Sequence, residues 1–117
     1  MTLLHSPIKN KVEQIRGSLG CSQEMLARII GVHTRTVVRW EHGVSQPHHL
    51  AREKIRKIEK LTEKIYDVFE PEDAVQWLNT SNKSFSSHTP LEEIIYSENG
   101  IEKVMDLLSS IEWGIVT

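Results

Sequence analysis

The stretch that decides the fold is Ser22–Pro47, SQEMLARIIGVHTRTVVRWEHGVSQP. Its opening serine can cap a first helix, and Gly31 is placed to end that helix in a left-handed conformation. A second helix begins at His33 or Thr34 and ends at Gly43. The residues predicted to face inward are Leu26, Ile29 and Ile30 in the first helix and Val37 and Trp40 in the second. The stretch therefore predicts two short crossed helices joined by a tight turn.

Polar residues occupy the side of the second helix opposite Val37 and Trp40. In a crossed helix pair of this kind, the amino-terminal end of the second helix enters the major groove of DNA. Arginine on that face can donate a bidentate pair to guanine, threonine can contact a thymine methyl or a phosphate, and glutamine at the start of the first helix can donate to a phosphate. The residues predicted to contact DNA are Gln23, Thr34, Arg35, Thr36, Val38 and Arg39.

Helical patterns continue on both sides of this pair. Ser6 and Pro7 can begin a helix whose pattern breaks at Gly17 to Gly20. From about His48 to Phe69 nothing interrupts a helix, and apolar residues recur every three or four positions along it. Such a stripe packs on its own domain or against a partner subunit.

The last third of the chain predicts three more short helices. Pro71 and Pro90 begin two of them, with a Ser- and Asn-rich loop, Thr80–Thr89, between. Asn99-Gly100 is expected to stop the second, and the third runs over Ile101–Trp113. No alternating pattern indicates a strand, so we expect an all-α protein with three parts: a helix-turn-helix bundle over 1–47, a connecting amphipathic helix over 48–70 and a small helical domain over 71–117.

The two halves of the chain carry opposite charge. Residues 1–60 hold 11 Lys and Arg against 5 Asp and Glu, which gives +6, while residues 61–117 hold 3 against 11, which gives −8. A basic segment gains counterion release on a polyanion, whereas an acidic segment is repelled by DNA. The charge distribution therefore predicts DNA binding in the first half and a different partner for the second.

Several classes of function are disfavoured. A single cysteine, Cys21, allows no internal disulfide, and no apolar run spans a bilayer, so we expect a soluble, cytoplasmic protein without a membrane partner. His42, His48 and His49 cluster near Glu41 but lack the spacing of a zinc helix, and no phosphate loop or nucleophile elbow is present. We expect no metal, no cofactor and no catalysis. An enzyme that uses the histidines would need a bound metal, lost on His48→Ala.

The motifs of the first half resemble the Xre and phage-repressor class of helix-turn-helix. The matching positions are Ser22-Gln23-Glu24, Leu26-Ala27, Gly31-Val32, Thr36-Val37, Arg39-Trp40-Glu41-x-Gly43 and Pro47. His33 departs from the class, which usually has Ser or Thr as the helix cap, and Val44-Ser45-Gln46 is an insert.

Residues 71–117 are similar to the carboxy-terminal toxin-binding domain of Xre, MbcA and ParS antitoxins. The matching positions are Ala74, Trp77-Leu78, Asn82, Pro90-Leu91, Gly100, Val104, Leu108, Ile111-Glu112 and Gly114. Ser86 and Ser87 stand where this family favours a glycine pair. Toxin contacts are expected at exposed positions near the loop and the carboxy terminus, namely Asn82, Ser86 and Trp113, and the tryptophan with the apolar residues after it could insert into a cleft.

The two resemblances together imply a type II antitoxin. It would bind operator DNA, regulate its own operon, and neutralise a cognate RES-domain toxin that consumes NAD by covering the entrance to the toxin's active site. Helix-turn-helix proteins usually bind two half-sites as dimers, so we expect a homodimer, formed through the connecting helix or the carboxy-terminal helices. The alternative is a stand-alone dimeric Xre-family transcriptional regulator whose acidic half only dimerises.

Overall fold

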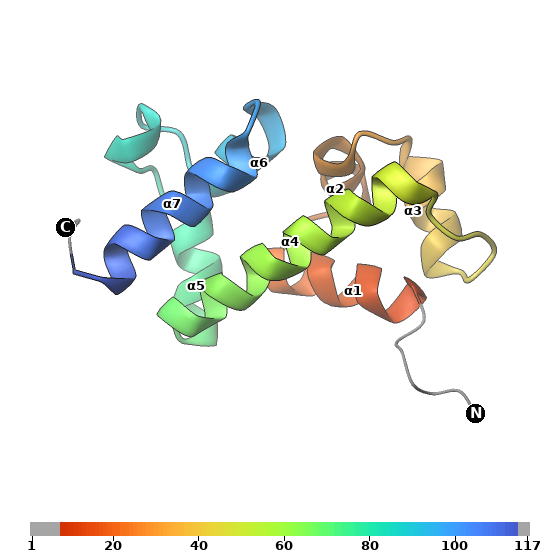
Figure 1. The fold of residues 1–117 in the computed structure, drawn as a ribbon, viewed down its shortest axis with the longest axis horizontal. Helices are drawn as coiled ribbons and strands as arrows, with labels where there is room; N and C mark the ends of the chain where they lie inside the picture. The colour runs from red at the N-terminus through yellow and green to blue at the C-terminus, as the bar shows by residue number, and fades with distance from the viewer. Residues whose placement is uncertain (1–7, 115–117) are drawn as a thin grey trace. The chain divides into compact units, whose positions relative to one another are not determined.

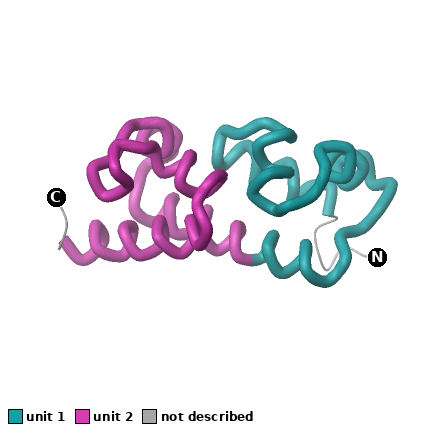
Figure 2. Tube along the Cα trace, turned by 90° about the horizontal axis from the view of Figure 1, so that it is seen from above, with its two compact units in different colours: residues 1–56 teal, residues 57–117 magenta. Residues whose placement is uncertain are grey.

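The computed structural model describes residues 8–114. They form an all-α protein in two compact units, which divide between Arg56 and Lys57 (Figures 1 and 2). The predicted fold class is confirmed. From the amino terminus the helices are α1 (Ile8–Leu19), α2 (Gln23–Ile30), α3 (Thr34–Glu41) and α4 (His49–Val68). They are followed by α5 (Pro71–Leu78), the short 3₁₀ helix η1 (Lys83–Phe85), α6 (Pro90–Tyr96) and α7 (Gly100–Glu112). The boundary between the units falls within α4.

In the amino-terminal unit, α3 packs on both α1 and α2. The Ser22 hydroxyl caps α2 by accepting from the Met25 amide at 3.0 Å, and Gly31 ends the helix in the left-handed region, at φ 89°. Both features follow the sequence prediction. The buried apolar residues of these three helices are Val12, Ile15, Leu19, Leu26, Ala27, Ile29, Ile30, Val37 and Trp40. They form the core that fixes which face of α3 points outward.

The ends of α1 and α3 agree with the prediction. Helix α1 ends at Leu19, within the predicted break at Gly17 to Gly20; Gly17 lies inside the helix, and Gly20 follows it in a left-handed conformation at φ 64°. A helix tolerates a single glycine at modest cost when its apolar stripe stays buried, and here the stripe extends to Leu19. Helix α3 ends at Glu41, and Gly43 directly follows the cap residue His42 in a left-handed conformation at φ 72°. The predicted cap at Ser6 and Pro7 lies outside the described residues.

Helix α4 carries the predicted apolar stripe. Its buried residues are Ala51 and Ile55 in the first unit and Ile58, Leu61 and Ile65 in the second. The sequence pattern predicts this stripe at Ile55, Ile58, Leu61, Ile65 and Val68, and of these Val68 is only half-buried. The other side chains are buried within the single chain, so the stripe serves as core.

In the carboxy-terminal unit, α6 contacts both α5 and α7. Thr89 and Glu92 form a reciprocal capping box at the start of α6: the Glu92 amide donates to the Thr89 hydroxyl at 3.0 Å, and the Thr89 amide donates to the Glu92 carboxylate at 2.8 Å. Phe69 packs against Trp77, with ring centroids 5.0 Å apart. The buried apolar side chains from α5 onward are Ala74, Leu78, Phe85, Leu91, Ile94, Ile95, Ile101, Val104, Leu107 and Leu108.

Asn99 and Gly100 have a different role from the predicted helix stop. Helix α6 ends earlier, at Tyr96, while Asn99 is the left-handed cap of α7 and Gly100 is that helix's first residue. A Cβ atom on Gly100 would lie 2.0 Å from the backbone oxygen of Glu93. Glycine is therefore required here because the start of α7 lies directly against the backbone of α6.

Candidate functional site

The outward face of α3 presents the side chains predicted to contact DNA. Thr34, Arg35 and Arg39 are exposed, while Thr36 and Val38 are half-buried at the edges of this face. Within residues 8–114, neither arginine has a hydrogen-bond or ion-pair partner. Arg35 and Arg39 lie one helical turn apart, so both guanidinium groups are free to donate on the same side of the helix.

The amino-terminal end of α3 opens onto a hollow of about 540 Å³ lined by residues 33–36. His33 occupies the capping position with extended backbone, but its side chain makes no hydrogen bond to the first turn. Amides in the first turn of a helix carry partial positive charge and favour anions. The uncapped turn, the hollow and Arg35 together form a surface suited to a phosphate or to the edge of a base.

A charged network connects the three helices of the amino-terminal unit. Arg16 of α1 donates to both carboxylate oxygens of Glu41 at the end of α3, through Nε at 2.6 Å and Nη2 at 3.1 Å. Gln23, the first residue of α2, donates through Nε2 to Oε1 of Glu41 at 2.8 Å. The Glu41 carboxylate thus holds the side chain of Gln23, which is predicted to contact a phosphate. The second hydrogen of the Gln23 side-chain amide remains available to another acceptor.

The network changes the acidity of its members. Burial alone would raise the pKa of Glu41, but the hydrogen bonds from Arg16 and Gln23 outweigh it and hold the pKa below its ordinary value. The same pairing raises the pKa of the Arg16 guanidinium. Burial raises the pKa of the nearby Cys21 thiol to about 11, so this cysteine is protonated at neutral pH and serves as packing.

The three predicted toxin contacts occupy different environments. Asn82 is half-buried and shapes its own loop: its Oδ1 accepts from the Ser84 amide at 2.9 Å. Ser86 is exposed and caps η1 in a left-handed conformation, at φ 55°. Trp113 follows α7 and is 78% exposed. Ser86 and Trp113 are thus available to a partner, whereas Asn82 contributes mainly to the shape of the loop.

The backbone conformation of Ser86 and Ser87 suits the glycine pair that the Xre, MbcA and ParS antitoxin family favours at these positions. Both serines have positive φ, 55° and 74° respectively. L residues adopt this region at a cost that glycine does not have. The loop therefore keeps the backbone path that glycines would favour, although serines occupy it.

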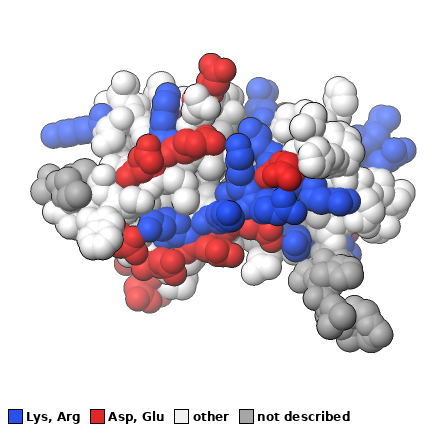
Figure 3. All heavy atoms as spheres, in the orientation of Figure 1, with Lys and Arg blue, Asp and Glu red and all other residues white. Residues whose placement is uncertain are grey.

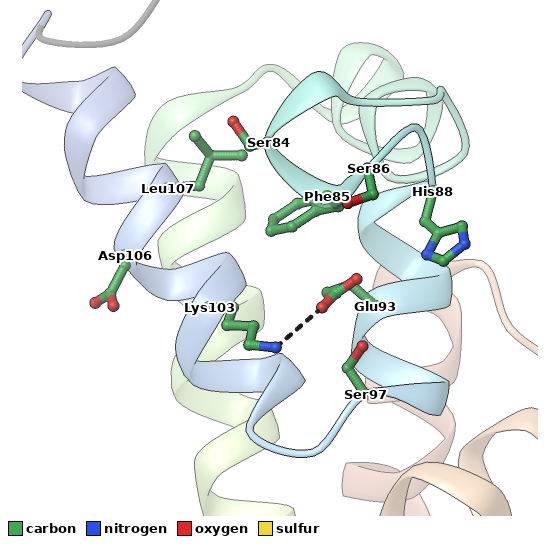
Figure 4. Close-up of a pocket in the computed structure, with 9 residues that line it drawn as sticks. All are labelled: Ser84, Phe85, Ser86, His88, Glu93, Ser97, Lys103, Asp106 and Leu107. Carbon is green, nitrogen blue, oxygen red and sulfur yellow. Dashed lines mark hydrogen bonds and ion pairs between the residues drawn. The ribbon is translucent and has the colours of Figure 1, made fainter.

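The same loop borders an open hollow of about 540 Å³ within the carboxy-terminal unit (Figure 4). Phe85, Ser86 and His88 line it from the loop side, and Glu93 and Lys103 line it from α6 and α7. Lys103 Nζ lies 3.5 Å from Glu93 Oε2, and the Glu93 side chain is only 8% exposed. The hollow thus has a nearly buried carboxylate in its wall.

Charged side chains of both signs meet on the surface. Figure 3 shows both basic and acidic side chains exposed on the face in view. Within the carboxy-terminal unit, Lys57 pairs with Glu102 at 3.5 Å and Lys64 pairs with Glu112, in each case from α4 to α7. Some of the acidic charge in this unit is therefore neutralised by its own helix α4.

Sequence reasoning did not identify the contacts of Arg16 with Glu41 or the close approach at Gly100. The sequence did contain a hint of the Arg16–Glu41 pair, because Glu41 directly follows the buried Trp40 and Arg16 directly follows the buried Ile15. Two charged residues at the margin of one core suggest an ion pair, but they are 25 residues apart in the sequence, and spacing alone does not show that they meet.

In the described part of the chain there is no group of His, Cys, Asp and Glu that could hold a metal ion. No helix between residues 8 and 114 is long and apolar enough to cross a membrane.

Comparisons with known proteins agree with both halves of this description. Residues 12–62 match the helix-turn-helix family, and residues 66–114 match the antitoxin Xre/MbcA/ParS C-terminal toxin-binding domain. The fold is similar to a chain in the crystal structure of the M. tuberculosis MbcT–MbcA toxin–antitoxin complex, with a TM-score of 0.70 and 18% identity over 97% of this chain and 100% of that one. A search of curated protein sequences found no match. The predicted resemblance is confirmed: one part of the chain matches the helix-turn-helix family, and the other matches the antitoxin Xre/MbcA/ParS C-terminal toxin-binding domain.

Proposed function

We propose that this antitoxin binds operator DNA through α3 and neutralises a cognate toxin through its carboxy-terminal unit. The observation that carries the DNA part is the free pair Arg35 and Arg39 on the exposed face of α3, in the more basic half of the chain. The toxin part is supported by the family match over residues 66–114. The family resemblance favours a RES-domain toxin that consumes NAD, with the antitoxin covering its active-site entrance.

The DNA-binding part follows from the geometry of the amino-terminal unit. With Val37 and Trp40 in the core, Arg39 is turned toward the groove and can donate a bidentate pair to guanine. Gln23, Thr34, Arg35, Thr36 and Val38 complete the proposed contact surface. A homodimer would place two copies of α3 about one helical turn of DNA apart, so the operator is expected to contain two half-sites.

Replacement of Arg39 by alanine tests the proposed base contact. We expect operator preference over unrelated DNA to fall by about 1–3 kcal/mol, while weak, salt-sensitive association remains. Fluorescence anisotropy with operator and scrambled duplexes measures both quantities. Lys83→Ala removes one exposed positive charge from η1 and is the matched control. An Arg39→Ala protein that keeps its full preference would contradict the placement of α3 in the groove.

Co-expression tests the toxin part. The toxin encoded beside this chain should arrest growth when made alone, and the antitoxin should restore it. Trp113→Ala is expected to weaken toxin binding at least tenfold, because a large exposed aromatic side chain is a typical interface anchor. Leu50→Ala, which alters an equally exposed apolar side chain in the other unit, is the control. Growth arrest that persists with both proteins present would refute neutralisation and favour the stand-alone regulator.

A further inference from the structure

The hollow beside Glu93 has the composition of a site for a side chain that carries a positive charge. The Glu93 carboxylate is only 8% exposed, and Lys103 approaches it no closer than 3.5 Å. A carboxylate removed from water is stabilised by short, charge-assisted hydrogen bonds, which are typically about 2.7–2.9 Å long. At 3.5 Å, Lys103 satisfies this requirement only weakly.

The other walls favour a planar cation. Figure 4 shows Phe85, which is only 7% exposed, on the same side of the hollow as the Ser86 hydroxyl group, with the Glu93 carboxylate and the Ser97 hydroxyl group also lining it. An arginine guanidinium can donate several hydrogen bonds in one plane, both to a carboxylate and to the hydroxyl groups beside it. A lysine ammonium is a compact and strongly hydrated charge, so it uses such walls less well.

The position of Lys103 fits that of a replaceable partner. Its side chain is 54% exposed, and it approaches Glu93 from α7 across the hollow (Figure 4). A flexible, half-exposed lysine can turn into solvent at little cost when a better donor arrives. Lys103 thus covers the carboxylate in the free protein and competes with an incoming cation.

We infer that this hollow receives an arginine side chain of the cognate toxin, which displaces Lys103 from Glu93. The inference rests on the proposed function of the carboxy-terminal unit. Charge complementarity selects the occupant, because residues 61–117 carry a net charge of −8 and attract a basic segment. Ser86, a predicted toxin contact, lies at the edge of the same hollow, next to the proposed arginine.

The first experiment uses Nα-acetyl-L-arginine amide as the probe and the full-length, isotope-labelled protein. We expect saturable NMR shifts at the amides of Ser86, Glu93 and Ser97, with millimolar affinity. The uncharged citrulline analogue should bind at least tenfold more weakly, and the lysine analogue several-fold more weakly. No saturable shift, or equal binding of the citrulline analogue, would overturn the inference.

Two variants with opposite expected effects separate this role from a structural one. Glu93→Gln should weaken the arginine probe at least tenfold, with Glu98→Gln, an exposed residue outside the hollow, as the matched control. Lys103→Ala should strengthen probe binding about threefold or more, because it removes the competing cation. If Lys103→Ala weakens the probe instead, Lys103 is part of the site and the inference is wrong.

The toxin itself distinguishes failure of this inference from failure of the proposed function. Glu93→Gln should weaken toxin binding at least tenfold while Glu98→Gln leaves it unchanged, with thermal unfolding confirming that both proteins are folded. A toxin that binds the wild-type protein and Glu93→Gln equally would overturn the arginine site but leave neutralisation intact. A toxin that binds neither would overturn the proposed function, and the arginine site as a toxin contact with it.

Discussion

Glu41 connects the stability of the amino-terminal unit to its proposed DNA-binding surface. This carboxylate is almost fully buried, and it accepts hydrogen bonds from Arg16 of α1 and Gln23 of α2. Removal of its charge would leave a partly buried guanidinium without its counterion. The same change would release Gln23, whose amide is oriented by this contact. One side chain therefore influences both the packing of three helices and the position of a proposed phosphate contact.

Glu41→Gln is expected to lower the free energy of unfolding by about 1–2 kcal/mol at neutral pH. Because folding lowers the pKa of Glu41, its stabilising contribution is present above the unfolded value of about 4.5 and is lost as the pH falls through the folded value. The difference between wild type and variant should therefore shrink below pH 4.5. Urea unfolding between about pH 3 and 7 measures it, with the exposed Glu24→Gln as control. A difference that does not depend on pH would rule out the charged pair as its source.

Ser87 gives a second prediction at the scale of single residues. Its φ of 74° is unfavourable for an L residue, by roughly 1 kcal/mol. Ser87→Gly should relieve this strain, and after the greater chain entropy of glycine is subtracted the net gain is about 0.5 kcal/mol. Ser84→Gly, in η1 and without a positive φ, should instead destabilise by a similar amount. Chemical denaturation of the two variants checks the opposite signs.

At the scale of elements, two glycines in helices differ in whether a side chain could replace them. Gly17 lies within α1, where a Cβ atom would meet no heavy atom inside 4 Å, while Gly100 begins α7 against the backbone of α6. Both glycines stand next to apolar stripes in the sequence, and the sequence pattern predicts one helix end over Gly17 to Gly20 and another at Asn99-Gly100. What distinguishes them is the neighbouring element, which sequence periodicity does not place.

Gly100→Ala is therefore expected to destabilise the protein by about 2–3 kcal/mol, because the new methyl group would force α7 away from the Glu93 carbonyl. Gly17→Ala serves as the control with the opposite sign, and it should gain about 0.5–1 kcal/mol from helix propensity. Thermal and urea unfolding, followed by circular dichroism, measure both changes. Equal effects of the two substitutions would contradict the close approach of α6 and α7.

At the scale of the whole molecule, charge separates the proposed partners. The net charge is +6 over residues 1–60 and −8 over residues 61–117, so the proposed DNA-binding and toxin-binding regions attract surfaces of opposite sign. Lys57, which lies outside residues 61–117, pairs with Glu102 and offsets only one of these negative charges. The separation disfavours binding of DNA by the carboxy-terminal region.

Operator affinity should therefore depend strongly on salt. A protein that contacts about four phosphates loses roughly a hundredfold in affinity between 50 and 200 mM salt. We expect at least this loss for the full chain, measured by anisotropy titrations at several salt concentrations. Lys83→Ala, in the acidic half, should leave the slope unchanged. A slope near zero would show that the basic half does not contact the phosphate backbone.

The sequence by itself determined the all-α fold, the inward and outward faces of α3, and the two family resemblances. These follow from apolar periodicity, cap residues and local motifs, which act over a few residues. The tertiary structure alone decided the pairing of Arg16 with Glu41, the need for glycine at position 100, and the hollow in which Glu93 faces Lys103. Each of these depends on how separate helices approach one another, and sequence spacing carries no record of that distance.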